Sequence, residues 1–217
     1  MFNEIDMHLI EIILLSLEVS LLAVIISCII SFPFAAFLSI KKFLGRGIVV
    51  IIINALMGLP PVVVGLFLYL LLSAHGSLAT YKLLYTPFAM IVAQVIIITP
   101  IITALSKESL DGFFIRYKDY LNSLRVNDFI IIRTLLWEAR HSLLINGLAG
   151  LGRGLSEVGA IIIVGGNIEH LTRTMTTGIV LETSKGEFSL ALNLGLTLLL
   201  ISLTINGALH LLRKKDE

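Results

Sequence analysis

The segment GLAGLGRGLSEVGAIIIVGG, from Gly147 to Gly166, has the length and apolar character of a membrane-spanning helix but contains two charged residues. About 20 apolar residues cross the roughly 30 Å hydrocarbon core of a bilayer. A charge at that depth costs at least about 2.5–3.5 kcal/mol. Arg153 and Glu157 stand four residues apart, so on a helix they share one face and can pair.

The same segment is rich in glycine, which lets the backbones of membrane helices approach closely. We therefore expect an interior membrane helix whose charged pair faces protein or a water-filled path. Two hypotheses remain for Arg153 and Glu157: they gate or line a path, or they only stabilise the fold.

The composition of the whole chain is that of an integral membrane protein. Its 217 residues are 57% hydrophobic and 14% charged, whereas soluble domains are about 45–50% apolar and about 25% charged. The net charge of +1 gives no indication of a nucleic-acid partner. The only cysteine, Cys28, excludes an internal disulfide. The acidic start, MFNEIDMH, is unlike a secretory signal, and we expect no cleavage there.

The apolar runs predict an all-α membrane protein with about five transmembrane helices, forming a single domain over residues 1–217. The predicted spans are about 8–40, 48–73, 87–105, the central segment 147–166, and 188–212.

Prolines and a carboxylate interrupt the first two runs. Pro33 is expected to kink the first helix. Pro60 and Pro61 break the second run within GLPPVVVGL, which indicates either a transport path or a packing kink. Glu18 is expected at or above the membrane interface, with a buried, paired carboxylate as the alternative.

The segment of about 106–140 is the most charged part of the interior of the chain, and it also carries six aromatic residues. This mixture favours short amphipathic helices at the membrane surface, or a docking surface for a soluble partner.

The distribution of basic residues predicts the orientation in the membrane, because cytoplasmic loops are enriched in Lys and Arg. With five spans, twelve basic residues fall on one side and three on the other. We therefore expect an outside N-terminus and a cytoplasmic C-terminus. The basic residues on the richer side are Lys41, Lys42, Arg46, Lys107, Arg116, Lys118, Arg125, Arg133, Arg140, Arg213, Lys214 and Lys215; those on the other are Lys82, Arg173 and Lys185.

Catalytic and phosphate-binding motifs are absent from the sequence. It has no G-x-x-x-x-G-K-[ST], no H-E-x-x-H and no G-x-S-x-G. Glu169-His170 is at most a weak metal hint, and no metal or cofactor is expected. A non-enzymatic transporter subunit is therefore the leading class, with its energy supplied by another chain.

Several segments resemble the membrane permeases of ABC importers, in the molybdate/tungstate branch and most of all its tungstate permeases. The matching segments are LLSLEVSLLAV (14–24), MGLPPVVVGLFLYLLLS (57–73), TPFAMIVAQ (86–94), GLGRGLSEVGAIIIVGGNI (150–168) and TRTMTTGIVLETSKGEFSLAL (172–192). The resemblance implies a plasma-membrane protein that pairs as a homodimer, contacts lipid, grips a cytoplasmic ABC ATPase and receives an oxyanion from an extracytoplasmic binding protein.

The resemblance also implies a short coupling helix in the cytoplasmic loop, which contacts the ATPase. The segment DYLNSLRV fits best: Asp119 takes the acidic place, whereas Arg125 stands where glycine is usual. The residues assigned to this element are Tyr117, Lys118, Asp119, Tyr120, Leu121, Leu124 and Arg125.

On the outer side, hydroxyl and guanidinium donors suit an oxyanion. Because the family assigns specificity mainly to the binding protein, the 172–177 loop is expected to be a docking and gate surface; a solvated loop is the alternative. The candidate path and gate residues are Pro60, Pro61, Arg153, Glu157, Gly165, Asn167, Thr172, Arg173, Thr176 and Thr177, with Thr174 beside them.

Two other classes compete with the permease. A secondary transporter or channel would use Arg153 and Glu157 as a charge relay, but the sequence shows no inverted repeat. An intramembrane enzyme lacks its motifs. The sequence does not separate tungstate from molybdate or sulfate, which are all tetrahedral dianions.

Overall fold

The computed structural model describes the backbone of residues 2–123 and 127–213, and the side chains of residues 9–117 and 127–207. The regular structure in these residues is helical. In chain order the helices are α1 (Phe2–Ile40), α2 (Arg46–Met57), α3 (Pro61–Leu72), the short 3₁₀ helix η1 (Ala79–Tyr81), α4 (Pro87–Ser123), α5 (Asp128–Glu138), α6 (Arg140–Leu155), α7 (Gly159–Gly165), α8 (Met175–Lys185) and α9 (Phe188–Arg213).

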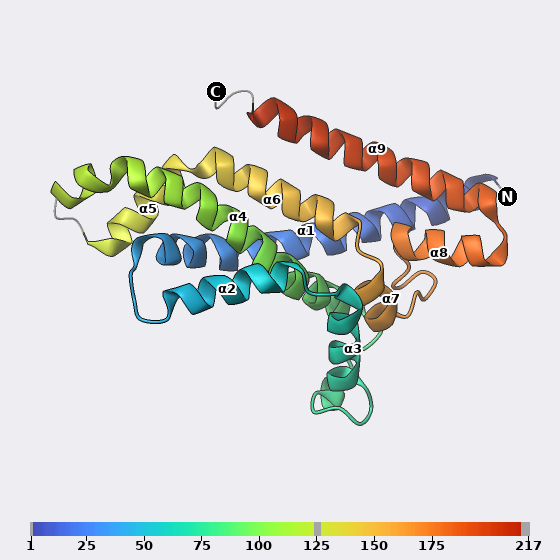
Figure 1. The fold of residues 1–217 in the computed structure, drawn as a ribbon. Coiled ribbons are helices and arrows are strands. Elements are labelled where there is room, and N and C mark those ends of the chain that lie inside the picture. The colour runs from blue at the N-terminus through green and yellow to red at the C-terminus, as the bar shows by residue number, and fades with distance from the viewer. Residues whose placement is uncertain (1, 124–126, 214–217) are drawn as a thin grey trace.

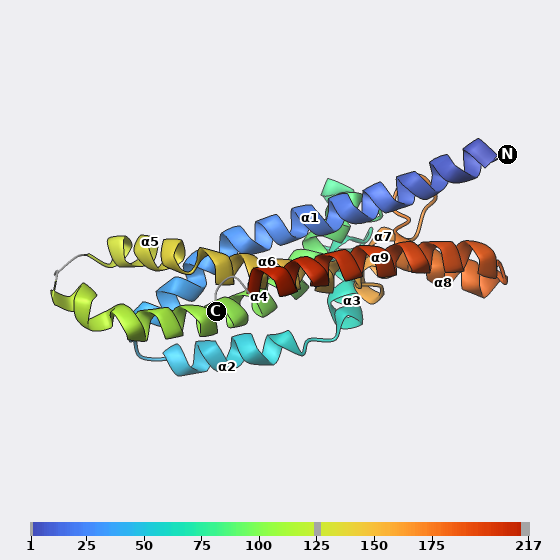
Figure 2. The same cartoon turned by 90° about the horizontal axis from the view of Figure 1, so that it is seen from above.

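Helices α1, α2, α4, α6 and α9 run along one common direction, as Figures 1 and 2 show together. Helix α3 projects from this bundle to one side (Figure 1). The C-terminal end of α4 and helix α5 lie at one end of the bundle, and α8 lies with the start of α1 at the other. The two ends of the molecule are therefore built from different parts of the chain.

The long helices α1 and α4 form the spine of the bundle, and hydroxyl groups join them. Thr99 donates a hydrogen bond from its hydroxyl to Ser27 Oγ (3.2 Å). Thr103 donates to Ser31 Oγ (3.0 Å). Between membrane helices, small polar side chains permit close approach and add hydrogen bonds, so this seam fixes α1 against α4.

Three helices are long and apolar enough to cross a membrane, within Leu9–Ile40, Pro87–Tyr117 and Phe188–Gly207. Two bent pairs raise the number to as many as five in the described residues: α2 with α3, bent by 97°, and α6 with α7, bent by 61°. The prediction of a helical membrane protein is confirmed, with three to five candidate spans.

The break between α2 and α3 is caused by the two prolines, as the sequence indicated. Pro60 is extended (φ −63°, ψ 122°), as a residue before proline usually is. Pro61 is the first residue of α3, where its missing N–H is not needed. The two prolines thus end one helix and begin the next.

The expectation of one continuous helix over 147–166 is wrong. Helix α6 begins at Arg140 and ends at Leu155, and α7 begins at Gly159. Glu157 lies in the break and accepts a hydrogen bond on Oε1 from the Ala160 N–H (3.1 Å). A carboxylate that caps the next helix competes with continuation of the first one.

The expectation of short helices throughout 106–140 is also wrong in its first half, since α4 continues without interruption to Ser123. The pair Lys107–Asp111 (2.6 Å), one turn apart, supports this continuation. The second half is a short helix as expected, α5, whose N-cap Asn127 accepts from the Ile130 N–H (2.9 Å).

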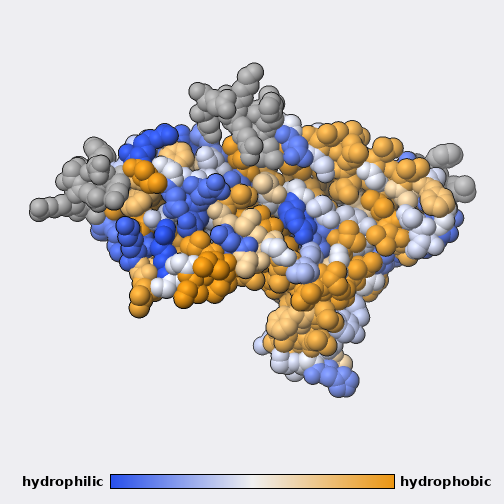
Figure 3. Space-filling view, in the orientation of Figure 1, coloured by the Kyte–Doolittle hydropathy of each residue, from blue (hydrophilic) through white to orange (hydrophobic). Residues whose placement is uncertain are grey.

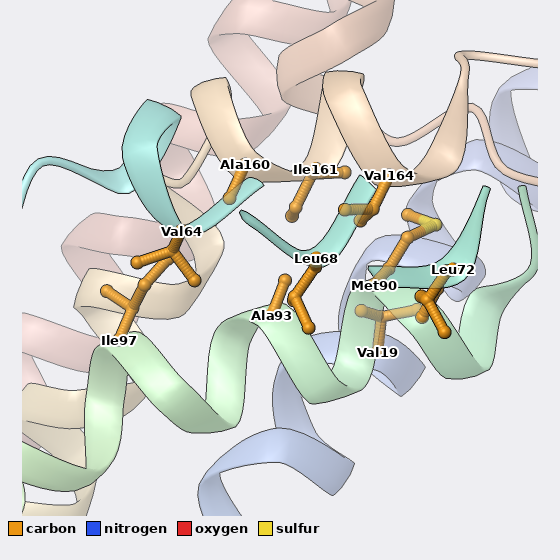
Figure 4. Packing of buried hydrophobic residues seen from close by; sticks show 11 residues of the cluster. Val19, Val64, Leu68, Leu72, Met90, Ala93, Ile97, Ala160, Ile161 and Val164 are labelled. Carbon is orange, nitrogen blue, oxygen red and sulfur yellow. The ribbon is translucent and has the colours of Figure 1, made fainter. Parts of the chain in front are cut away.

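A buried hydrophobic cluster lies where α1, α3, α4 and α7 meet (Figure 4). In it, Val64 and Leu68 of α3 face Ala93 and Ile97 of α4 and Ala160 of α7. The cluster connects the broken spans to the spine.

Hydrophobic side chains cover most of the visible face of the bundle and the α3 arm, whereas hydrophilic residues gather mainly at the α4–α5 end (Figure 3). Large apolar residues of α2 and α9 are more than half exposed, among them Ile48, Ile51, Leu196 and Leu200. Soluble monomers rarely expose so much contiguous apolar surface, and lipid is the natural solvent for it.

Candidate functional site

The Arg153–Glu157 pair forms at the break between α6 and α7. Arg153 donates from Nη1 to Glu157 Oε2 (2.7 Å). Glu157 is buried, with 3% of its side chain exposed, whereas the Arg153 side chain is 34% exposed. The carboxylate is thus inside the protein, and the guanidinium extends from it toward an accessible surface.

Glu157 also connects α7 to α8. Its side chain caps α7 through the Ala160 N–H, while its backbone carbonyl accepts from Thr176 Oγ of α8 (2.8 Å). One residue therefore connects the C-terminal end of α6, the N-terminal end of α7 and the start of α8.

The two broken spans meet beside this residue, because two glycines allow α3 to approach α7 closely. A Cβ on Gly65 would lie 2.9 Å from the Cα of Ala160, and a Cβ on Gly159 would lie 2.7 Å from Val62 Cγ2. The breaks at Pro60–Pro61 and at Glu157 are therefore adjacent, and the structure brings these predicted residues together.

The predicted outer residues form a tight internal network. Gly165 is buried, and its carbonyl accepts from Thr172 Oγ1 (2.6 Å). The same Thr172 oxygen accepts from the Ile168 N–H (2.9 Å). Asn167 has a positive φ of 50° and donates from Nδ2 to the Thr177 carbonyl (3.4 Å). These bonds close the turn between α7 and α8.

The expectation that the threonines of this loop offer exposed donors is wrong. Thr172, Thr174, Thr176 and Thr177 are all buried. Thr174 and Thr177 form the capping box at the start of α8, and Thr176 bonds to Glu157. Their hydroxyls are used to stabilise helix ends, so they do not face outward.

Arg173 lies beside acidic side chains. Its side chain is 11% exposed and pairs with Glu169 (3.2 Å). A pocket of about 230 Å³ next to it is lined by Glu11, Glu18 and His170. His170 Nδ1 contacts Glu11 Oε2 (2.7 Å) and so connects this loop to α1. Glu18 is exposed, so the alternative prediction of a buried carboxylate is wrong.

The end of α7 packs on a loop tyrosine. The Tyr85 N–H donates to the Val164 carbonyl (2.8 Å), and the Tyr85 ring lies against Gly166. Desolvation, followed by the interaction with Tyr69, raises the pKa of the Tyr85 phenol above its usual value.

A buried amide that sequence reasoning missed lies near the centre of the bundle. Gln94 of α4 is 1% exposed and donates to Ser20 Oγ (3.3 Å) and to the Gly154 carbonyl (3.0 Å). Its Oε1 has no partner among the described residues. The signal for this seam was the repetition of hydroxyl residues along the first apolar run: Ser16, Ser20, Ser27, Ser31 and Ser39.

The segment that the sequence predicts as the coupling element belongs to the end of α4 as far as Ser123, and is not a separate short helix. Tyr117 is half-buried and packs against the cluster that holds Leu110 and Leu135. The side chains of Lys118, Asp119, Tyr120 and Leu121 lie outside the described residues, as do Leu124 and Arg125 entirely.

Ionic contacts brace this end of the bundle. Lys41 at the end of α1 pairs with Asp128 of α5. Arg46 of α2 donates to the Leu38 carbonyl (2.7 Å) and lies 3.9 Å from Asp111 of α4. These contacts join the α4–α5 end of the bundle to α1 and α2.

Comparisons with known proteins decide the family. No protein-family model matches the chain. It is 36% identical over 205 residues to the probable anion ABC transporter permease protein of Haloferax volcanii, covering 92% of this chain and 88% of that one. It is 35% identical over 210 residues to the tungstate uptake system permease protein TupB of Peptoclostridium acidaminophilum, covering 97% and 92%.

The chain belongs to the ABC-transporter permeases. A more distant relative is the molybdenum transport system permease protein ModB of Azotobacter vinelandii, 23% identical over 208 residues and 92% of each chain. The chain is therefore a multi-pass membrane subunit of an ABC importer and is not itself catalytic. Membership of the family implies an ATPase and a binding protein as partners.

Proposed function

We propose that this permease carries tungstate, or a closely related tetrahedral oxyanion, into the cell. The observation that supports the substrate is similarity to tungstate permeases over 97% of the chain in one relative and 76% in another, from Campylobacter jejuni. Molybdate and sulfate are the alternatives, since the donors that suit one tetrahedral dianion suit the others.

We further propose that the N-terminus is outside and the C-terminus cytoplasmic. Twelve of the basic residues then lie on the cytoplasmic side and three outside, following the usual enrichment of Lys and Arg in cytoplasmic loops. In this orientation the charged α4–α5 end faces the ATPase, and the start of α8 faces the binding protein.

The proposed assembly is a homodimer of permeases, each bound to an ATPase through residues 117–125, which comprise the end of α4 and the residues that follow it. This end carries the aromatic and charged residues of a docking surface, with Tyr117 and Tyr120 as anchors and Lys118 and Asp119 at the rim. The ionic contacts of Lys41 and Arg46 carry movement from there into α1 and α2.

The moving part of the gate is proposed to be the junction of the two broken spans. Helices α3 and α7 pack through Gly65 and Gly159 and would move as one unit. Glu157 is the pivot, because it caps α7, pairs with Arg153 and accepts from Thr176. When the gate opens, these contacts break and the helices adopt a second packed arrangement. Alternating access requires two such arrangements of the permease.

The substrate is tested by measuring cellular tungsten, molybdenum and sulfur with and without this gene, at trace supply of the three oxyanions. We expect a selective fall in tungsten on deletion and its recovery when the gene is returned. A fall mainly in molybdenum or sulfur would assign molybdate or sulfate as the substrate instead. No fall in any of the three elements would contradict the oxyanion proposal.

A further inference from the structure

An apolar cavity of about 730 Å³ opens between α1 and the α5–α6 segment, away from the junction of the broken spans. Its walls include Leu21, Cys28 and Pro33 on one side and Leu144 and Leu151 on the other. The two walls run antiparallel, since Gly147 of α6 lies against Cys28, and Gly154 lies near Ser20.

The cavity is about as long as one leaflet of a bilayer. From Leu21 to Pro33 a helix rises about 18 Å, at about 1.5 Å per residue. Half of the roughly 30 Å hydrocarbon core is about 15 Å. The rim is open to lipid, because Ile25, Ile29 and Leu144 are all exposed by 46% or more.

A single charged residue, Arg140, lines the cavity among the residues that the structure describes. It lies at the end near Pro33, where α5 gives way to α6. Its guanidinium stacks over the Trp137 ring, 4.9 Å from the centroid, and donates from Nη1 to the Trp137 carbonyl (2.9 Å). No carboxylate in the described part of the chain pairs with it.

We propose that a phospholipid with a net anionic headgroup occupies this cavity, with its phosphate on Arg140 and an acyl chain between α1 and α6. The planar fork of arginine suits phosphate oxygens. An exposed tryptophan next to it is typical of the membrane–water interface. A purely apolar helix face of a second copy would not neutralise this guanidinium, which favours the lipid.

The chain contains one tryptophan, so Trp137 fluorescence reports directly on the Arg140 end of the cavity. The full-length chain is placed in phosphatidylcholine vesicles that contain increasing fractions of dibrominated phosphatidylglycerol or dibrominated phosphatidylcholine, whose bromine atoms quench on contact. We expect the anionic lipid to quench at about fivefold lower mole fraction, the preference that one basic residue near the surface provides.

The variant Arg140→Gln should abolish this preference, so that both brominated lipids quench alike. Lys42→Gln is the matched control, because Lys42 is an exposed cation at the same end of the bundle but does not line the cavity. Equal quenching by both lipids in the unchanged chain, or an unchanged preference in Arg140→Gln, overturns the proposal.

Cys28 gives a second, independent measurement inside the cavity, since it is the only cysteine. Its alkylation by N-ethylmaleimide should slow as the phosphatidylglycerol fraction rises, and should not do so in Arg140→Gln. If a short bis-maleimide joins Cys28 of two chains in vesicles, a second copy covers the cavity and the lipid proposal is wrong.

Discussion

At the scale of single residues, the account depends most on Glu157. Its two carboxylate oxygens have separate partners, the Ala160 N–H and the Arg153 guanidinium. Glu157→Gln retains an oxygen acceptor for the N–H but removes the charge that Arg153 needs. Since Arg153 is partly exposed, the pair is worth about 1 kcal/mol, so we expect uptake to fall about fivefold. Initial uptake rates at equal amounts of folded permease check this.

A matched control is Glu182→Gln. Glu182 is also buried and also pairs with a nearby cation, Lys185 (3.0 Å), but it lies on α8 away from the breaks. Oxyanion uptake by the Glu182→Gln permease should stay near that of the unchanged chain. If both variants slow uptake equally, or if Glu157→Gln transports normally, Glu157 is a structural residue only.

At the scale of helices, the packing of α3 on α7 has a specific consequence. Gly65→Ala places a Cβ against the backbone of Ala160, which cannot yield. We expect this substitution to lower the free energy of unfolding by about 1–3 kcal/mol and to lower the melting temperature of the purified chain. In Gly159→Ala the one tight contact of the new Cβ is with Val62 Cγ2 (2.7 Å), so Val62→Ala in the same chain should restore most of the lost stability.

The control for these variants is Gly195→Ala on α9, where a Cβ would have nothing within 4 Å. It should leave the melting temperature unchanged or raise it slightly, since alanine favours a helix over glycine. Equal effects of Gly65→Ala and Gly195→Ala would contradict the close packing of α3 on α7.

The end of α4 carries the prediction on the ATPase. Replacing Asp119 and Tyr120 by Ser should reduce the ATPase recovered with the purified permease by about tenfold, since anchoring side chains contribute most of an interface's binding free energy. Tyr81→Ser is the control, because Tyr81 is an exposed tyrosine of η1 and lies outside the proposed contact segment 117–125. Unchanged ATPase recovery would place the contact elsewhere.

A helix break could be predicted from the sequence where it has a local backbone cause, and could not where it depends on contacts of the folded chain. Pro60 and Pro61 indicated the break between α2 and α3, because proline acts on the backbone locally. The break at Glu157 could not be predicted, since its glycines also suit a continuous membrane helix and the capping bond needs the folded chain. The length of α4 was missed because the charges after Ser106 resembled a loop.

The buried threonines were missed for a similar reason. The Thr174 and Thr177 capping box pairs two threonines, whereas the familiar pattern has Glu or Gln in the second position. Their burial also depends on a distant residue: Ser16 of α1 accepts from the Met175 N–H (2.8 Å). Such long-range contacts are not visible in the local sequence.

At the scale of the whole molecule, the proposed orientation predicts which positions can be labelled from outside. In a Cys28→Ser chain, a cysteine at position 82 should react with a membrane-impermeant maleimide added to intact cells. A cysteine at position 42 should react only after the cells are opened. The reverse pattern would invert the orientation and place the α4–α5 end outside.

The central claim is that this chain moves an oxyanion only when a separate ATPase drives it. It is tested most directly by tungstate uptake into vesicles that contain the permease with or without its ATPase and binding protein. We predict accumulation when all three proteins and ATP are present, and none with the permease alone. Accumulation by the permease alone, driven by a proton or sodium gradient, would contradict the claim.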